Sequence, residues 1–156
     1  MSTDLSALVA PERILADASA ASRKQAFAAL ADLLARDTGF SASEILSEVM
    51  ERERLGSTAV GEGVAIPHAR IDGLDAPIGA FARLQNAADF DAVDERPCDL
   101  IFMLLAPRAN GADHLRALAQ VSRAFRQPDV RDAIRNAGSA EAILSALCPQ
   151  ARGEAA

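Results

Sequence analysis

The longest apolar run of the chain is Leu100-Ile-Phe-Met-Leu-Leu-Ala106, which ends at Pro107. A strand with one face in water alternates apolar and polar residues, whereas a strand that is covered on both faces is apolar throughout. Pro107 lacks the N–H that would continue the hydrogen-bond ladder. The run therefore predicts a central strand in a sheet that has helices on both faces.

Two amphipathic helices are predicted before this run. Ser22 can cap the first helix, and Gly39 ends it. Ser41 and Glu44 form a capping box at the start of the second helix, which is expected to end near Gly56. The apolar positions at helical spacing are Phe27, Leu30, Leu33, Leu34, Ile45, Leu46, Val49 and Met50.

Three more helices are predicted after the run. Asp113 can cap the first, Pro128 stands at the favoured first position of the second, and Ser139 with Ala140 opens the third. The residues expected to face inward are Leu115, Leu118, Ser122 and Phe125 in the first of these helices, and Ile143, Leu144 and Leu147 in the last.

Shorter strands are predicted at residues 13–16, at residues 64–66 before Pro67, and at residues 78–84, with a loop over residues 56–63. Strands mixed with helices on either side predict the α/β class. We expect a three-layer α/β/α arrangement in which at least four helices flank one mixed β-sheet.

The even composition of the 156-residue chain predicts a single domain over residues 1–156. Its core is expected in about residues 5–147. Residues 149–156 are small and polar, so this tail is expected to fray.

Composition and charge exclude several classes of function. The net charge of −6 disfavours nucleic acid as a partner, because phosphate binding needs a basic surface. No apolar run reaches the roughly 18 residues of a membrane span, and the N-terminus lacks a signal peptide, so we expect a cytoplasmic protein without membrane insertion. Cys98 and Cys148 form no CxxC motif and are expected to be reduced thiols.

The chain contains two histidines, His68 after a predicted strand and His114 at the start of a predicted helix. A phosphoryl acceptor needs a neutral imidazole nitrogen, which an unperturbed histidine supplies near neutral pH because its pKa is about 6.5. Pro67 restricts the backbone before His68. The transferred group is anionic, so catalysis would depend on placement and countercharge.

Several residues are candidates to bind the phosphoryl oxygens. Arg52 and Arg54 lie at the end of the second helix, and a guanidinium can donate two parallel hydrogen bonds to phosphate. His114, after Asp113 in a first helical turn, would add a ring donor near the positive end of a helix dipole. Ordinary roles stay open for Arg52, four residues after Glu48, and for His114 as a packed helical residue.

Gly61 and Gly63 precede the first histidine, and the backbone N–H groups around them would suit an anion-binding nest. The same glycines would also suit a plain tight turn, and His68 would suit a hydrogen-bonded surface position. A catalytic zinc site requires three protein ligands, and the chain has only two histidines. The GxSxG turn of a serine hydrolase is also absent from the sequence. We therefore expect no metal and no cofactor.

The segment from Arg52 to Arg70, RERLGSTAVGEGVAIPHAR, closely resembles the active-histidine motif of the fructose/mannitol-type IIA domains of the bacterial phosphotransferase system. Its LGST and GxGxAIPH runs are most similar to those of the nitrogen-regulatory IIA proteins. Further matches at residues 90–94, 100–107 and 113–119 extend the likeness over roughly residues 5–147.

This resemblance implies the family's mixed sheet between helices and a role for each matching residue. His68 would be phosphorylated on Nε2, with Nδ1 held by a hydrogen bond. Arg52 would steady the phosphoryl group, and His114 would hydrogen-bond near it. Ala59 and Ala69 stand where relatives usually carry Gly, which makes the preceding loop stiffer and the approach of a partner backbone less certain.

The resemblance also implies a phosphotransferase component with a phosphohistidine intermediate. A histidine phosphocarrier protein would donate the phosphoryl group, and the phosphorylated state would regulate a transporter, a kinase or nitrogen metabolism. Two alternatives stay open, a stand-alone sugar component that passes phosphate to a IIB domain and a binding module that is never phosphorylated. The sequence identifies neither the regulated target, nor a sugar, nor the oligomeric state.

Overall fold

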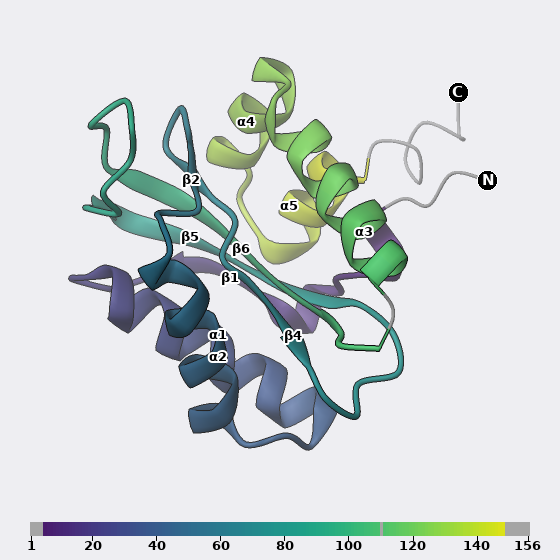
Figure 1. Cartoon of the computed structure of the whole chain (residues 1–156). Helices are drawn as coiled ribbons and strands as arrows, with labels where there is room; N and C mark the ends of the chain where they lie inside the picture. The colour runs from purple at the N-terminus through teal and green to yellow at the C-terminus, as the bar shows by residue number, and fades with distance from the viewer. Residues whose placement is uncertain (1–4, 110, 149–156) are drawn as a thin grey trace.

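The computed structural model describes residues 5–109 and 111–148. The tail expected to fray, residues 149–156, lies outside the described residues. The helices of the described part are α1 (Arg23–Thr38), α2 (Ala42–Arg54), α3 (Gly111–Phe125), α4 (Pro128–Arg135) and α5 (Ala140–Leu147), with short 3-10 helices at Leu5–Ala7 and Pro11–Arg13. Figure 1 shows α1 and α2 on one face of the sheet and α3, α4 and α5 on the other, which confirms the α/β/α prediction.

The sheet is mixed and contains six strands within the described residues. The strands are β1 (Ile14–Ala18), β2 (Ala59–Gly61), β3 (Val64–Ala65), β4 (His68–Ile71), β5 (Ile78–Ala88) and β6 (Cys98–Pro107). Their order is β1-β5-β6-β3-β2, and β4 also pairs with β6. The β1–β5, β3–β6 and β4–β6 pairs are parallel, whereas β5–β6 and β2–β3 are antiparallel.

The apolar run forms the central strand β6, as predicted, and its side chains divide between two cores. Leu100, Phe102 and Leu104 belong to the core under α3, α4 and α5, whereas Ile101 and Met103 belong to the core under α1 and α2. All five side chains are fully buried. Burying a large apolar side chain stabilises a fold by about 1.5–3 kcal/mol, so β6 stabilises the packing of both helical layers on the sheet.

The serine caps predicted for α1, α2 and α5 form as expected. Ser22 accepts a hydrogen bond from the Gln25 N–H, and Ser41 accepts one from the Glu44 N–H. Ser139 likewise caps α5, and Pro128 occupies the first turn of α4. Gly39 caps the C-terminus of α1 with a left-handed φ of 82°. Glycine adopts this φ without strain because it has no Cβ.

The inward stripe predicted for α3 was wrong at its start. α3 begins at Gly111, so Asp113 lies inside the first turn instead of capping it. Leu115 is 65% exposed, because the neighbouring His114 takes the inward position. The buried residues of α3 are His114, Ala117, Val121 and Phe125.

Two strand predictions also need correction. Residues 59–61 form strand β2 of a short hairpin with β3, where a continuous loop was expected. Pro67 was expected to interrupt the strand before it, yet the chain resumes pairing as β4 directly afterwards. The reason is that Pro67 offers its carbonyl to the N–H of Leu104 on β6 (2.9 Å), so the missing proline N–H leaves this contact intact.

Gly79 on β5 is required by the packing beneath it. A Cβ at this position would lie 2.5 Å from a ring carbon of the buried Phe102. We expect Gly79→Ala to lower the free energy of unfolding by about 1–3 kcal/mol, because the ring must leave its packed position. Urea denaturation measures the effect. Gly138→Ala is the control, since a Cβ there meets nothing within 4 Å, and equal stability of the two variants would contradict the prediction.

Candidate functional site

The site lies at β4, where helices from the two opposite layers meet. Within the described residues β4 pairs with β6 alone, so its other edge faces outward. α2 packs against β4 from one layer, as Figure 1 shows, and His114 in the first turns of α3 reaches His68 of β4 from the other layer. The cleft between them encloses about 360 Å³ and is lined by Glu48, Glu51, Arg52, Leu55, His68, Ala69, Arg70, Arg108 and His114.

His68 is held at the start of β4 by its own backbone. Its Nδ1 lies 2.8 Å from the carbonyl oxygen of Ile66. A carbonyl oxygen can only accept a hydrogen bond, so Nδ1 carries the proton. In the neutral ring, Nε2 is therefore the nitrogen with a free lone pair, and the contact with Ile66 fixes the orientation of the ring.

The structure brings His114 beside His68. Their ring centroids are 5.5 Å apart, and the rings are inclined by 47°. His114 is buried, and its Nδ1 has no hydrogen-bond partner among the described residues. Buried polar atoms in proteins are nearly always paired, so this nitrogen is a candidate to bind a ligand.

Burial and nearby cations favour the neutral forms of both rings. The pKa of His68 is lowered mainly by burial and further by the positive charge of Arg52, against the opposing effects of the Ile66 carbonyl and Glu53. The pKa of His114 is lowered by burial, then by His68 and Arg70. Both shifts run below the ordinary 6.5, so at neutral pH each ring retains a lone pair.

Arg52 lies in the cleft, as a phosphate-binding role requires. Its Nη1 donates a hydrogen bond to the carbonyl oxygen of Gly56 (3.1 Å), which fixes the guanidinium at the end of α2. Arg54 lies outside the residues that line the cleft and forms an exposed ion pair with Glu51 (2.9 Å). The structure therefore brings Arg52 to His68 but does not bring Arg54 there.

Two arginines of the cleft were missed from the sequence. Arg70 stands two residues after His68 on β4, so both side chains point to the same face of the strand. That alternation would have identified Arg70 had β4 been predicted. Arg108 follows β6 and binds Asp72 (2.9 Å) and Glu48 (3.5 Å), and in a chain with 16 basic residues nothing in the sequence singles it out.

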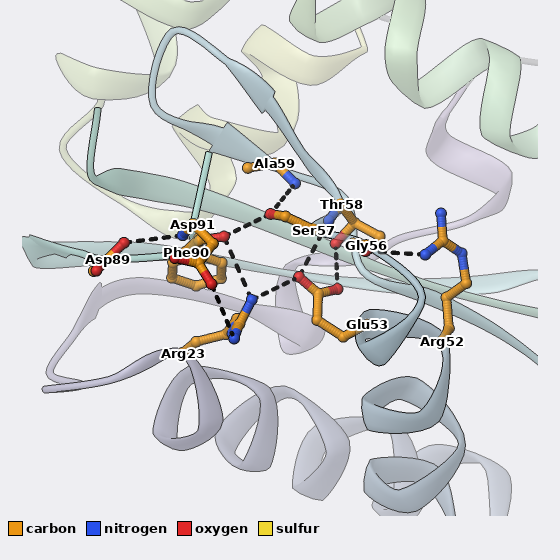
Figure 2. Close-up of polar contacts among 10 residues, drawn as sticks. All are labelled: Arg23, Arg52, Glu53, Gly56, Ser57, Thr58, Ala59, Asp89, Phe90 and Asp91. Carbon is orange, nitrogen blue, oxygen red and sulfur yellow. Dashed lines mark hydrogen bonds and ion pairs between the residues drawn. The ribbon is translucent and has the colours of Figure 1, made fainter. Parts of the chain in front are cut away.

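A buried carboxylate behind the cleft was also missed. Figure 2 shows Glu53 between Arg23 and Thr58. Its oxygens accept hydrogen bonds from the Thr58 hydroxyl (2.7 Å), the Thr58 N–H (3.1 Å) and Arg23 (3.3 Å). Ser57 and Arg23 both donate to the carbonyl of Phe90, which ties this loop to the segment after β5.

Gly61 and Gly63 lie away from the cleft, in the β2–β3 hairpin turn. The Gly63 carbonyl accepts hydrogen bonds from the N–H groups of Asp99 and Leu100, whereas His68 is in register with Leu104. Four residues along a strand span about 13 Å. The structure therefore does not bring these glycines to His68.

Asp113, the last of the predicted site residues, lies outside the cleft. Asp113 forms an ion pair with Arg116 (3.0 Å) on the same helix and does not line the cleft. In residues 5–109 and 111–148, no group of three or more His, Cys, Asp or Glu side chains could hold a metal ion. Cys98 and Cys148 are buried and form no disulfide among the described residues, and burial raises the pKa of Cys98 to about 12.

The family model of the phosphoenolpyruvate-dependent sugar phosphotransferase system, EIIA 2, matches residues 7–148. The chain belongs to this family. A nitrogen regulatory protein of Bradyrhizobium diazoefficiens is 46% identical over 140 residues, which are 90% of this chain and 92% of the relative. A fructose-specific EIIA component of Haloferax volcanii is 38% identical over 147 residues, 93% of this chain and 95% of the relative.

A solved structure of this family supports the same assignment. The crystal structure of the nitrogen regulatory protein IIA-Ntr from Neisseria meningitidis superposes with a TM-score of 0.87 at 34% identity. The match covers 92% of this chain and 98% of that one. IIA proteins take phosphoryl groups from upstream carriers and pass them on, so the chain is a phosphotransfer component. No helix in the described residues is long and apolar enough to span a membrane.

Arg52→Gln tests the electrostatic link between Arg52 and His68. The Arg52 charge lowers the pKa of His68, so its removal favours the imidazolium form and is expected to raise that pKa. An NMR titration of the His68 ring protons measures the change. Arg54→Gln, outside the cleft, is the control and should leave the His68 pKa unchanged, whereas an unchanged pKa in Arg52→Gln would place the guanidinium away from the ring.

Proposed function

We propose that this chain is a cytoplasmic, single-domain phosphoryl carrier that accepts a phosphoryl group on Nε2 of His68 from a histidine phosphocarrier protein. The observation that supports this most directly is the hydrogen bond from Nδ1 of His68 to the Ile66 carbonyl. It leaves the lone pair of Nε2 as the nucleophile. Family membership supplies the phosphotransferase context.

The transfer needs no proton to move. The lone pair of His68 Nε2 forms a bond to phosphorus while the bond between phosphorus and the donor's ring nitrogen breaks, and the electron pair of that bond stays on the donor. The proton stays on Nδ1 throughout and keeps its hydrogen bond to the Ile66 carbonyl. The ring therefore keeps one orientation in both states, which reduces the reorganisation that accompanies transfer.

Arg52 and His114 would stabilise the transferred group. Phosphoryl transfer passes through a loose transition state with charge on the equatorial oxygens, so donors fixed beside the phosphorus are effective. Arg52 uses one N–H on Gly56 and keeps others for phosphate oxygens. The unpartnered Nδ1 of His114 marks a second polar group at the same cleft.

The output of this carrier would be regulatory. A phosphoryl group adds about −1.5 to −2 charges at pH 7 to a cleft lined by three arginines. Leu55 lines the cleft and is 83% exposed, so an apolar contact surface adjoins the charge that changes. The nitrogen regulatory relatives support a regulatory output. We propose a transporter or a kinase as the regulated partner.

A second candidate function is the supply of phosphate to a sugar transporter. The relative from Haloferax volcanii is a fructose-specific EIIA component with nearly the same length coverage. In this case the phosphorylated chain would pass its phosphoryl group to a IIB domain. Transfer of the phosphoryl label from the phosphorylated chain to an added IIB domain would favour the sugar function. Retention of the label on this chain would favour the regulatory function.

Replacement of either histidine distinguishes the acceptor from its neighbour. We expect His68→Ala to take up no acid-labile phosphate from a phosphorylated histidine carrier, because the nucleophile is gone. His114→Ala should take up one equivalent per chain at a rate reduced by about 100–1,000-fold, typical of losing one transition-state donor. Labelling of His68→Ala at the wild-type level would remove the proposal, and complete loss in folded His114→Ala would exchange the two roles.

A pull-down with two variants tests the regulatory output. His68→Asp mimics the added negative charge and His68→Ala fixes the uncharged state, so we expect the two baits to retain different partners. Identical partners on both baits and on unmodified protein would favour a binding module that phosphorylation does not control.

A further inference from the structure

The segment between α2 and β2 connects the two principal groups of the cleft, and its conformation sets the position of both. The Gly56 carbonyl accepts a hydrogen bond from Arg52, which holds the guanidinium. The Thr58 carbonyl accepts one from the Ile66 N–H (3.0 Å), and the Ile66 carbonyl in turn holds the His68 ring. A shift of this segment would therefore displace Arg52 and His68 together.

Glu53 fixes this segment at two points. Its backbone carbonyl accepts a hydrogen bond from the Gly56 N–H (3.1 Å). Its side chain accepts both the N–H and the hydroxyl of Thr58. Glu53 thus binds the N–H groups of Gly56 and Thr58. The carbonyls of these same two residues hold Arg52 and Ile66.

The burial of Glu53 makes this connection rigid. Its side chain is 2% exposed, and Arg23 supplies the neighbouring positive charge at 3.3 Å. A buried carboxylate is costly unless donors satisfy it, and here three donors converge on its two oxygens. The side chain has few alternative positions that would keep these contacts, so the loop has few alternatives as well.

We infer that Glu53 is a positioning residue for phosphoryl transfer, which acts through Thr58 and Ile66 to hold the His68 ring with its proton on Nδ1 and to keep Arg52 beside it. The carboxylate touches neither the ring nor the phosphoryl group. This inference rests on the proposed acceptor role of His68, but the hydrogen-bond chain itself can be tested in the unphosphorylated protein.

The first test replaces Glu53 by Gln, which preserves the size of the side chain but puts an N–H donor where one acceptor oxygen stood. The readout is the ¹⁵N spectrum of the His68 imidazole at a pH where the ring is neutral, since it reports which nitrogen carries the proton. We expect the wild type to be protonated on Nδ1, and Glu53→Gln to transfer part of this population to Nε2. Glu44→Gln, the same change in the first turn of α2, should give the wild-type spectrum.

The second test isolates the hydroxyl link. Thr58→Val keeps the shape of the side chain but loses the hydrogen bond to Glu53, whereas Thr58→Ser keeps the bond. We expect Thr58→Val to change the His68 spectrum in the same way as Glu53→Gln. Thr58→Ser should give the wild-type spectrum. The initial rate of phosphoryl uptake should fall about tenfold in Glu53→Gln and Thr58→Val and stay near the wild type in Thr58→Ser.

The outcomes separate this inference from the proposed function. Wild-type protein that takes up no phosphate would remove the proposed function, while the imidazole spectra would still decide whether Glu53 positions the ring. Wild-type spectra in both Glu53→Gln and Thr58→Val would overturn the inference. If Glu53→Gln fails to fold, the pair at Thr58 decides, because unchanged spectra in Thr58→Val then overturn it.

Discussion

The geometry of the cleft depends on how residues 64–71 pair with β6. This segment runs parallel to β6 as β3 and then as β4, and the Pro67 carbonyl continues the contact between them. Because the ladder is maintained on both sides of Pro67, the Ile66 carbonyl is left to accept the imidazole proton of His68. The interruption of the ladder between β3 and β4 thus fixes the orientation of the His68 ring. The apolar burial of β6 supplies the stability that maintains this local geometry.

The charges around the histidines differ in how far they are already neutralised. Arg108 binds Asp72 and Glu48, so its charge is largely compensated. Within the described residues Arg52 and Arg70 form no ion pair, which leaves their charges for an anionic group. The same cations and the burial of the rings keep both histidines neutral. The positive charges that would suit an anionic group therefore also favour the neutral, lone-pair form of the two rings.

The sequence was informative where one residue type has one local physical role. Ser22 and Gly39 mark the two ends of α1, because a side-chain acceptor favours a helix N-terminus and a left-handed residue favours a helix C-terminus. A run that is apolar on both faces has to lie inside a sheet, as β6 does. The family motif likewise placed Arg52, His68 and His114, which the structure brings to one cleft. The missed features arise from long-range pairing. β4 exists because β6 accepts it as a partner, and the burial of Glu53 depends on Thr58 and Arg23, whose approach no local pattern records.

The three central side chains come from different parts of the architecture. Arg52 comes from the α1–α2 layer, His114 from the α3–α5 layer and His68 from the strand between them. A chain in which only one layer has docked on the sheet holds at most two of these groups in place. Under the proposed function, incompletely folded molecules would therefore lack a complete acceptor site and would be poor recipients of phosphate.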